Sequence, residues 1–181
     1  MNIVYTHLEG CFILEPKIIK DDRGYFYESY NKNTFKRITG LDINFVQDNQ
    51  SFSTKGVLRG LHYQIGDAAQ AKLVRVIQGA VLDVAVDIRK DSATFGQYVA
   101  IELSNDNKKQ LFIPRGFAHG FVVISDEAEF AYKCDNFYSK EHERGIIYND
   151  GQLAISWPFK NDELLVSEKD SILPAFKDAE L

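Results

Sequence analysis

An arginine and a histidine lie three residues apart in the segment 57–64, which reads VLRGLHYQ. An imidazole can accept and return a proton near neutral pH, and a guanidinium can bind a phosphate through two parallel hydrogen bonds. The β-branched and aromatic residues predict a strand, whose side chains alternate between two faces. Arg59 and His62 would then face opposite sides, unless the alternation slips at Gly60, which permits a bulge. Taken alone, His62 is more typical of a satisfied core or rim residue than of a catalytic group.

A second pattern, PRGFAH at 114–119, follows the apolar run QLFI and ends in His119. This Pro-x-Gly-x-x-His order resembles the second motif of the cupins, which are double-stranded β-helix jelly rolls. In cupins the first motif usually adds two histidines, two residues apart, and a glutamate, and together these residues bind a metal. The matching place here holds His62 and Gln64, followed by the cation Lys72, a set that opposes a divalent metal. We therefore expect a cupin that works without a metal.

The composition of the 181-residue chain predicts one β-rich domain over residues 1–181. Hydrophobic residues make up 45% and aromatic residues 13% of the chain, which is enough for a sizeable core. Short apolar runs alternate with polar turns, almost without helical periodicity. We expect an all-β, cupin-type jelly roll with a few short peripheral helices, a core over about residues 43–160, N-terminal strands and a C-terminal tail.

Three local patterns predict individual elements. The segment 72–89 predicts a pair of strands around Gln78-Gly79. The segment 153–159, LAISWPF, predicts the last strand of the β part. Residues 34–39, followed by Gly40, predict a short helix that ends at its glycine.

Charge and cysteine content exclude several classes of function. The chain has 21 Lys and Arg against 26 Asp and Glu, a net charge of −5, and no basic stripe that could follow a nucleic-acid polymer. Two cysteines, Cys11 and Cys134, are too few for a disulfide framework and match no metal spacing. There is neither a signal-peptide pattern nor an apolar run of 18 residues, so we expect a cytoplasmic protein with no membrane contact.

Several long motifs in order resemble the dTDP-4-dehydrorhamnose 3,5-epimerase family. They extend over nearly the whole chain and include DDRGYFYESYN, QDNQSFS, VLRGLHYQ, FIPRGFAHGF, YKCDNFYS and ERGIIYND. The departure is the loop 65–71, IGDAAQA, where many members have prolines. The resemblance implies 3,5-epimerisation of dTDP-4-dehydro-6-deoxy-D-glucose to dTDP-4-dehydro-L-rhamnose in dTDP-L-rhamnose biosynthesis, with no cofactor.

That reaction needs particular residue types. The C–H bonds at C3 and C5 of a 4-keto sugar are acidic because each carbanion is an enolate, so inversion needs a base, an acid on the opposite face and a stabiliser for the oxygen. The resemblance implies His62 as the base and Asp170, in the C-terminal tail, as the carboxylate that orients it. It implies Tyr132 as the acid and Lys72 as the cation beside the enolate oxygen. Without the family, Ser167 to Asp170 is only a helix-cap pattern, Lys72 a solvated lysine and Tyr132 a cross-strand aromatic.

The nucleoside diphosphate of such a substrate calls for cations at the phosphates and flat groups at the thymine. The resemblance implies these substrate-binding residues: Arg23, Phe26, Glu28, Gln47, Asp48, Asn49, Arg59, Lys72, His119, Tyr138, Glu143 and Lys169. Phe26 and Tyr138 are the candidates to stack on the base. Each of them alone would be an exposed charge or a core aromatic; only their joint occurrence in order supports a site.

The resemblance also implies a homodimer. In it the N-terminal strand segment is exchanged, so that Arg23, Phe26 and Glu28 reach the site of the partner subunit. Three alternatives stay open: a related nucleotide-sugar 3-epimerase for another deoxysugar, a metal-dependent cupin oxygenase, and a non-catalytic sugar-binding cupin.

Overall fold

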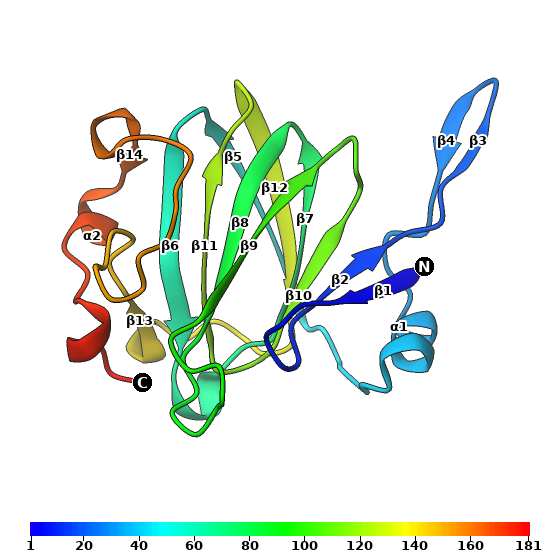
Figure 1. Ribbon diagram of the computed structural model, residues 1–181. Helices are drawn as coiled ribbons and strands as arrows, with labels where there is room; N and C mark the ends of the chain where they lie inside the picture. The colour runs from blue at the N-terminus through cyan, green and yellow to red at the C-terminus, as the bar shows by residue number, and fades with distance from the viewer.

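The computed structural model describes residues 1–181 and contains two sheets that face each other (Figure 1). Sheet A has the order β1 (Asn2–Tyr5), β2 (Phe12–Glu15), β10 (Gln110–Ile113), β7 (Lys72–Gln78), β12 (Glu127–Cys134), β5 (Gln47–Thr54). Sheet B has the order β13 (Glu143–Gly145), β6 (Val57–Gln64), β11 (Phe117–Val123), β8 (Ala80–Asp87), β9 (Tyr98–Ser104), and β14 (Leu165–Val166) pairs in parallel with β6. All other pairs are antiparallel, which agrees with the predicted all-β jelly roll.

The inner faces of the two sheets form the main hydrophobic core. Phe130 of sheet A stacks on Phe121 of sheet B with ring centroids 4.2 Å apart. The outer face of sheet B is covered as well, because Val84 and Val86 pack against Phe176 of the C-terminal segment. Sheet B is therefore buried on both faces, and its central strands read as nearly continuous apolar runs.

A bulge at Gly60 changes the alternation of β6, which is the slip that a shared site for Arg59 and His62 would require. His62 pairs with His119 and Arg59 pairs with Phe121, so that three steps on β6 match two on β11. Gly60 has φ +115°, and a Cβ there would lie 2.6 Å from the carbonyl oxygen of His119. Only glycine fits this close approach, and the slip turns Arg59 and His62 toward the same cavity.

Strands β7 and β8 are both present, but the prediction that they pair with each other is wrong. They belong to opposite sheets, and the chain crosses from one sheet to the other at Gly79. Gly79 has φ +76°, and a Cβ there would collide with the backbone of Glu127. The glycine therefore makes a corner between sheets rather than a hairpin turn.

Two further expectations about the strands need correction. The segment 153–159 contains no strand; its apolar residues pack on the outer face of sheet B without joining the hydrogen-bond ladder. The sheets also extend beyond the expected core of 43–160, because β1 and β2 form one edge of sheet A.

The helices are short and peripheral. Helix α1 (Lys32–Thr39) is capped by Asn31 and ends at Gly40, which has φ 75°, in agreement with the predicted glycine stop. Helix α2 (Glu168–Ser171) lies in the C-terminal segment beside sheet B. No helix of the chain is both long and apolar enough to cross a membrane.

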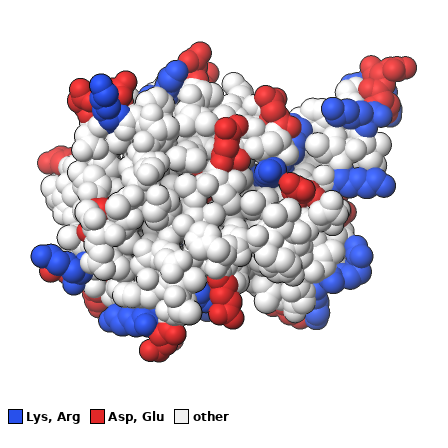
Figure 2. Space-filling view, in the orientation of Figure 1, with Lys and Arg blue, Asp and Glu red and all other residues white.

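The hairpin of β3 (Ile19–Asp21) and β4 (Gly24–Phe26) stands apart from both sheets (Figure 1). Every residue of its two strands is exposed. Figure 2 shows that Lys, Arg, Asp and Glu side chains of both signs are mixed on this face of the molecule, with no continuous basic stripe.

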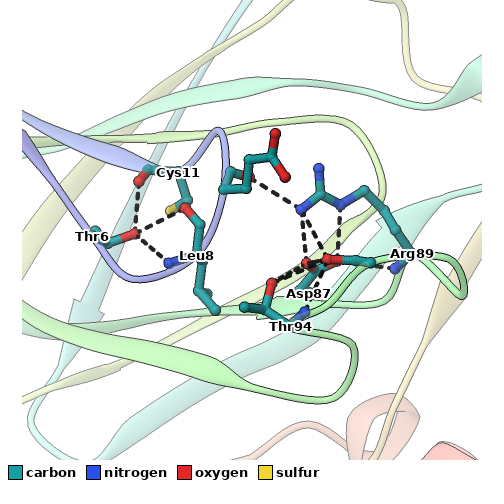
Figure 3. Close-up of polar contacts among 8 residues, drawn as sticks. Thr6, Leu8, Cys11, Asp87, Arg89 and Thr94 are labelled. Atoms are coloured by element: carbon teal, nitrogen blue, oxygen red, sulfur yellow. Dashed lines mark hydrogen bonds and ion pairs between the residues drawn. The ribbon is translucent and has the colours of Figure 1, made fainter.

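A partly buried polar cluster around Asp87 ties together the loops at one end of β8 (Figure 3). We define the Asp87 cluster as Asp87, Arg89, Ser92 and Thr94. Arg89 donates to Asp87 from its backbone N–H, Nε and Nη2, at 3.0, 2.9 and 2.7 Å, and the Ser92 and Thr94 hydroxyls donate at 2.6 and 2.7 Å. Arg89 Nη2 also donates to the carbonyl of Glu9 at 3.0 Å, which connects the loop after β8 to the turn between β1 and β2.

Candidate active site

A cavity of about 460 Å³ between the sheets brings together the four residues expected to be catalytic. His62 reaches it from β6 of sheet B, whereas Lys72 and Tyr132 reach it from β7 and β12 of sheet A. Asp170 reaches it from α2. The two facing sheets thus place His62 and Tyr132 on opposite walls.

His62 and Asp170 form a close pair. His62 Nε2 lies 2.7 Å from Oδ1 of Asp170, and the Gly60 N–H donates to Oδ2 at 3.1 Å. Burial alone would raise the pKa of Asp170, but the contact with His62 holds it below its ordinary value. The carboxylate therefore stays ionised, while the His62 side chain, 31% exposed, is open to the cavity. This is the arrangement of a base with an orienting carboxylate.

The helix-cap interpretation of Ser167 to Asp170 also holds. The Ser167 hydroxyl accepts a hydrogen bond from the Asp170 N–H at 3.1 Å and caps α2. The Asp170 carboxylate does not complete a capping box, because both of its oxygens face β6. The cap fixes the backbone, and the side chain remains free to contact His62.

Lys72 and Tyr132 lie next to each other on sheet A. The Lys72 ammonium is 5.9 Å from the centre of the Tyr132 ring. Burial lowers the pKa of Lys72 and raises the pKa of Tyr132. Near neutral pH the phenol is therefore protonated, which suits an acid.

His119 lines the cavity as expected, and it is held by a residue that the sequence did not reveal. His119 Nε2 lies 2.9 Å from Oδ2 of Asp83, and both side chains are buried. Burial lowers the pKa of His119. The signal for Asp83 was an acidic residue in the apolar strand sequence AVLDVAVD.

Arg59 projects into the cavity beside His62. Its Nε and Nη2 donate to the Ser53 hydroxyl at 3.1 and 3.0 Å, so the guanidinium is held by β5. Ser53 is a second contributor that sequence reasoning missed, since a serine in a polar strand carries no distinctive signal.

Five of the expected substrate-binding residues form a hydrogen-bonded network that begins at Lys169, which lines the cavity. Gln47 Oε1 accepts the N–H of Tyr138 at 3.0 Å, and the Tyr138 hydroxyl donates to Glu143 at 2.9 Å. Lys169 Nζ donates to the same Glu143 oxygen at 2.6 Å. Tyr138 is 51% exposed, so part of the residue is accessible to a ligand. Asn49 joins the network by accepting from Gln47 Nε2 at 3.1 Å.

Asp48 lies outside this cavity, contrary to expectation. Its carboxylate pairs with Lys133 at 2.8 Å on the outer face of sheet A, where a separate cavity of about 470 Å³ lies. Neighbouring side chains of a strand point to opposite sides, so the side chain of Asp48 points away from those of Gln47 and Asn49, although Asn49 also lines the separate cavity.

Arg23, Phe26 and Glu28 also lie away from the cavity of their own chain. Arg23 and Phe26 belong to the projecting β3–β4 hairpin, where Arg23 pairs with Asp21 and the Phe26 ring is exposed (Figure 1). Glu28 follows the hairpin and accepts a hydrogen bond from Asn31 at 3.1 Å. A single chain therefore does not bring these three residues to the site.

The chain has no group of three or more His, Cys, Asp or Glu side chains that could hold a metal ion. That the reaction needs neither metal nor cofactor stays a prediction, which full activity after exhaustive chelation would support.

Comparison with known proteins identifies the family. A family model described as dTDP-4-dehydrorhamnose 3,5-epimerase matches residues 5–178. The enzyme of that name from Shigella flexneri is 55% identical over 180 residues, 99% of this chain and 98% of the relative. The crystal structure of the Elizabethkingia anophelis enzyme of that name is 55% identical, with a TM-score of 0.95 over 98% of this chain and 97% of the other. A Legionella pneumophila dTDP-6-deoxy-D-glucose-3,5-epimerase, solved in complex with dTDP-4-keto-L-rhamnose, is 50% identical, with a TM-score of 0.94 over 98% and 93%. This chain belongs to the dTDP-4-dehydrorhamnose 3,5-epimerase family.

Proposed function

We propose that the chain inverts C3 and C5 of dTDP-4-dehydro-6-deoxy-D-glucose to give dTDP-4-dehydro-L-rhamnose, an intermediate of dTDP-L-rhamnose biosynthesis, with His62 as base and Tyr132 as acid. The family to which the chain belongs catalyses this epimerisation. The observation that supports the two roles is the position of His62 and Tyr132 on facing sheets, across one cavity. A proton removed and returned on the same face restores the original configuration. Inversion therefore needs groups on both faces.

Each inversion then has two proton transfers. His62 takes the proton from carbon, the C–H electron pair forms the C=C bond of the enolate, and negative charge develops on the C4 oxygen. Asp170 stabilises the imidazolium, and the Lys72 ammonium stabilises the oxygen. The carbon then takes the phenolic proton of Tyr132 on the opposite face, which re-forms the ketone. Exchange with solvent reprotonates the phenolate and deprotonates the imidazolium before the second carbon reacts.

The nucleotide is assigned to the outer part of the site. Arg59 lies beside His62 and suits a diphosphate oxygen, because its fork can donate two hydrogen bonds. Tyr138 is held at the rim by Gln47 and Glu143, and its accessible part can stack on thymine. Lys169 lies between the rim and the cavity and offers a second cation to the phosphates.

The exchanged homodimer belongs to the same proposal. In it the β3–β4 hairpin carries Arg23, Phe26 and Glu28 to the cavity of a second copy. Two features support the exchange: the hairpin projects from its own sheets, and its apolar Ile19, Tyr25 and Phe26 are exposed.

A complementation experiment tests the exchange. Two inactive variants, Arg23→Ala and His62→Ala, are mixed under conditions that let subunits exchange. If each hairpin serves the other subunit, a mixed dimer regains one intact site, and up to about half the mixed population shows one-site activity. Unchanged inactivity of a verified mixed dimer would contradict the exchange.

The experiment that tests the reaction is incubation with the dTDP-4-keto sugar in deuterated water. We expect deuterium at both C3 and C5, with product of inverted configuration at both carbons by NMR. A 3-epimerase would label C3 only, and a sugar-binding cupin would label neither carbon. A cupin oxygenase would lose its turnover on chelation.

The Tyr132→Phe variant tests the assignment of the acid. It keeps the aromatic packing but removes the phenolic proton, so we expect exchange through His62 to continue while doubly inverted product falls sharply, most severely at C5. Product stereochemistry is compared at matched extents of exchange. Normal double inversion would mean that the acid lies elsewhere, and Tyr138 would be tested next.

A further inference from the structure

A buried carboxylate that the proposed mechanism does not use lies behind the cavity. Asp83 projects inward from β8 and is 0% exposed. Oδ2 contacts His119, but Oδ1 has no hydrogen-bond partner, and it is the one buried side-chain nitrogen or oxygen in the chain without any. Because buried polar atoms are nearly always hydrogen-bonded, such an exception calls for an explanation.

The first consequence of Asp83 concerns the tautomer of His119. Because the carboxylate accepts the proton of Nε2, only Nδ1 is left for another partner. Burial, opposed by Asp83 and reinforced by the nearby Lys72 and His62, lowers the pKa of His119 and favours the neutral ring. A neutral ring with the proton on Nε2 presents Nδ1 as a hydrogen-bond acceptor, which suits a hydroxyl of the sugar.

The second consequence concerns the charge of Lys72. Lys72 forms no ion pair with a carboxylate. The groups that oppose its desolvation are Cys134, Asp83 and Glu143. Burial raises the pKa of the Cys134 thiol to about 11, so that thiol is uncharged near neutral pH, and Glu143 is already paired with Lys169. Of these three groups, Asp83 is the carboxylate with no lysine or arginine partner, and its proximity favours the ammonium form of Lys72.

We propose that Asp83 is a positioning residue of the epimerisation site, which fixes His119 with Nδ1 as an acceptor and keeps Lys72 charged toward the enolate oxygen. The proposal rests on the proposed function for the roles of His119 and Lys72. Asp83 itself does not touch the substrate. Oδ1 of Asp83 accepts no hydrogen bond. The carboxylate can therefore act electrostatically on the neighbouring site residues.

Strand β8 supplies a matched control. Asp87 is four residues further along, faces the same interior and is also 0% exposed. Both of its oxygens accept hydrogen bonds within the Asp87 cluster. The changes Asp83→Asn and Asp87→Asn are thus the same chemical substitution on the same strand. They differ in that one oxygen of Asp83 lacks a hydrogen bond, whereas both oxygens of Asp87 accept one.

The experiment compares these two variants in kinetics, thermal stability and NMR. We expect Asp83→Asn to lose turnover by about 100-fold, the scale of one preorganised electrostatic group, with a Tm no lower than that of the unmodified protein and dTDP affinity within about threefold. Asp87→Asn should show the reverse, with a lower Tm and unchanged turnover of the folded protein.

Two NMR measurements separate a positioning role from a structural one and do not depend on activity. With ¹⁵N-labelled histidine, His119 should carry its proton on Nε2 and lose this fixed tautomer in Asp83→Asn. With ¹³C-labelled lysine, assigned with Lys72→Met, Lys72 should titrate at lower pH in Asp83→Asn. Should Asp83→Asn not fold, Asp83→Leu tests the same expectations.

Normal turnover in the Asp83 variant overturns the proposal, as do an unchanged His119 tautomer and Lys72 titration. If the unmodified protein exchanges neither carbon in deuterated water, the proposed function fails instead, and the two NMR results remain a test of Asp83.

Discussion

Asp83 and Asp87 lie on one strand, face one interior and are equally buried, yet their surroundings are opposite. Asp87 accepts hydrogen bonds on both oxygens, from Arg89, Ser92 and Thr94. Asp83 has one contact, to His119, and one bare oxygen. A fully satisfied buried carboxylate holds loops in place. An unsatisfied one costs stability but leaves its charge free to act on neighbouring groups.

The same contrast separates two larger regions of the molecule. The cavity holds His62, Lys72 and Tyr132, each with part of its hydrogen-bonding capacity unused. In the Asp87 cluster both carboxylate oxygens accept hydrogen bonds. The Arg89 guanidinium also lies 4.8 Å from the centre of the Phe117 ring. Substitutions in the cavity should therefore change rates, whereas substitutions in the cluster should change stability.

The largest effect is expected at the base. His62→Ala should slow deuterium exchange at both carbons by about 10⁴-fold, the upper range for a general base. Unfolding in urea and dTDP affinity should stay close to those of the unmodified protein, because His62 lies at the wall of an open cavity. Near-normal exchange at either carbon would show that another residue removes that proton.

The second largest effect is expected on stability rather than on turnover. Arg89→Met leaves the buried Asp87 carboxylate without its ion-pair partner and should lower the free energy of unfolding by about 3–5 kcal/mol. Turnover of the folded protein at low temperature should be unchanged. Urea unfolding curves give the comparison, with the exposed neighbour change Lys90→Met as control. An Arg89→Met variant with unchanged stability and impaired turnover would link the Asp87 cluster to catalysis. It would contradict the expected difference between the cluster and the cavity.

The smallest effect is a pH dependence of stability. Burial alone would raise the pKa of Asp87, but the hydrogen bonds from Arg89, Ser92 and Thr94 lower it from 3.8 to about 2. A depressed pKa means that the stabilisation is present above pH 3.8 and is lost as the pH falls toward 2. The difference between these two pKa values corresponds to about 2 kcal/mol in the free energy of unfolding.

This acid dependence can be isolated by comparing unfolding curves of the unmodified protein and Asp87→Asn between pH 7 and pH 2. The unmodified protein should lose its advantage as the pH falls through this range. A constant difference between the two proteins would mean that the cluster does not stabilise the ionised carboxylate.

Residue types and motif order predicted the main elements of the site, but alternation did not predict how the strands are arranged. The bulge at Gly60 could be anticipated only as a condition, namely that Arg59 and His62 serve one site. Gly79 was ambiguous, because a glycine between two apolar strands fits both a hairpin turn and a corner between sheets. The apolar segment 153–159 was mistaken for a strand because packing on a sheet and joining it need the same side chains.

The contributors that sequence reasoning missed or misplaced have a common physical cause. Asp83 was missed because its role depends on His119, which becomes its neighbour only when β8 and β11 pair. Asp48 was misplaced because it was assigned together with its neighbours Gln47 and Asn49 as one motif. In a strand the side chain of the middle residue points to the opposite face. Such contacts are properties of the tertiary fold rather than of local sequence.

The pairing of His62 with Asp170 joins residues that are 108 positions apart in the chain. Helix α2, which carries Asp170, follows every strand of both sheets. During synthesis from the N-terminus, β6 is therefore made long before the carboxylate that orients its imidazole. The pair can therefore form only after every strand has been made, and a prematurely terminated chain would contain His62 without its carboxylate partner.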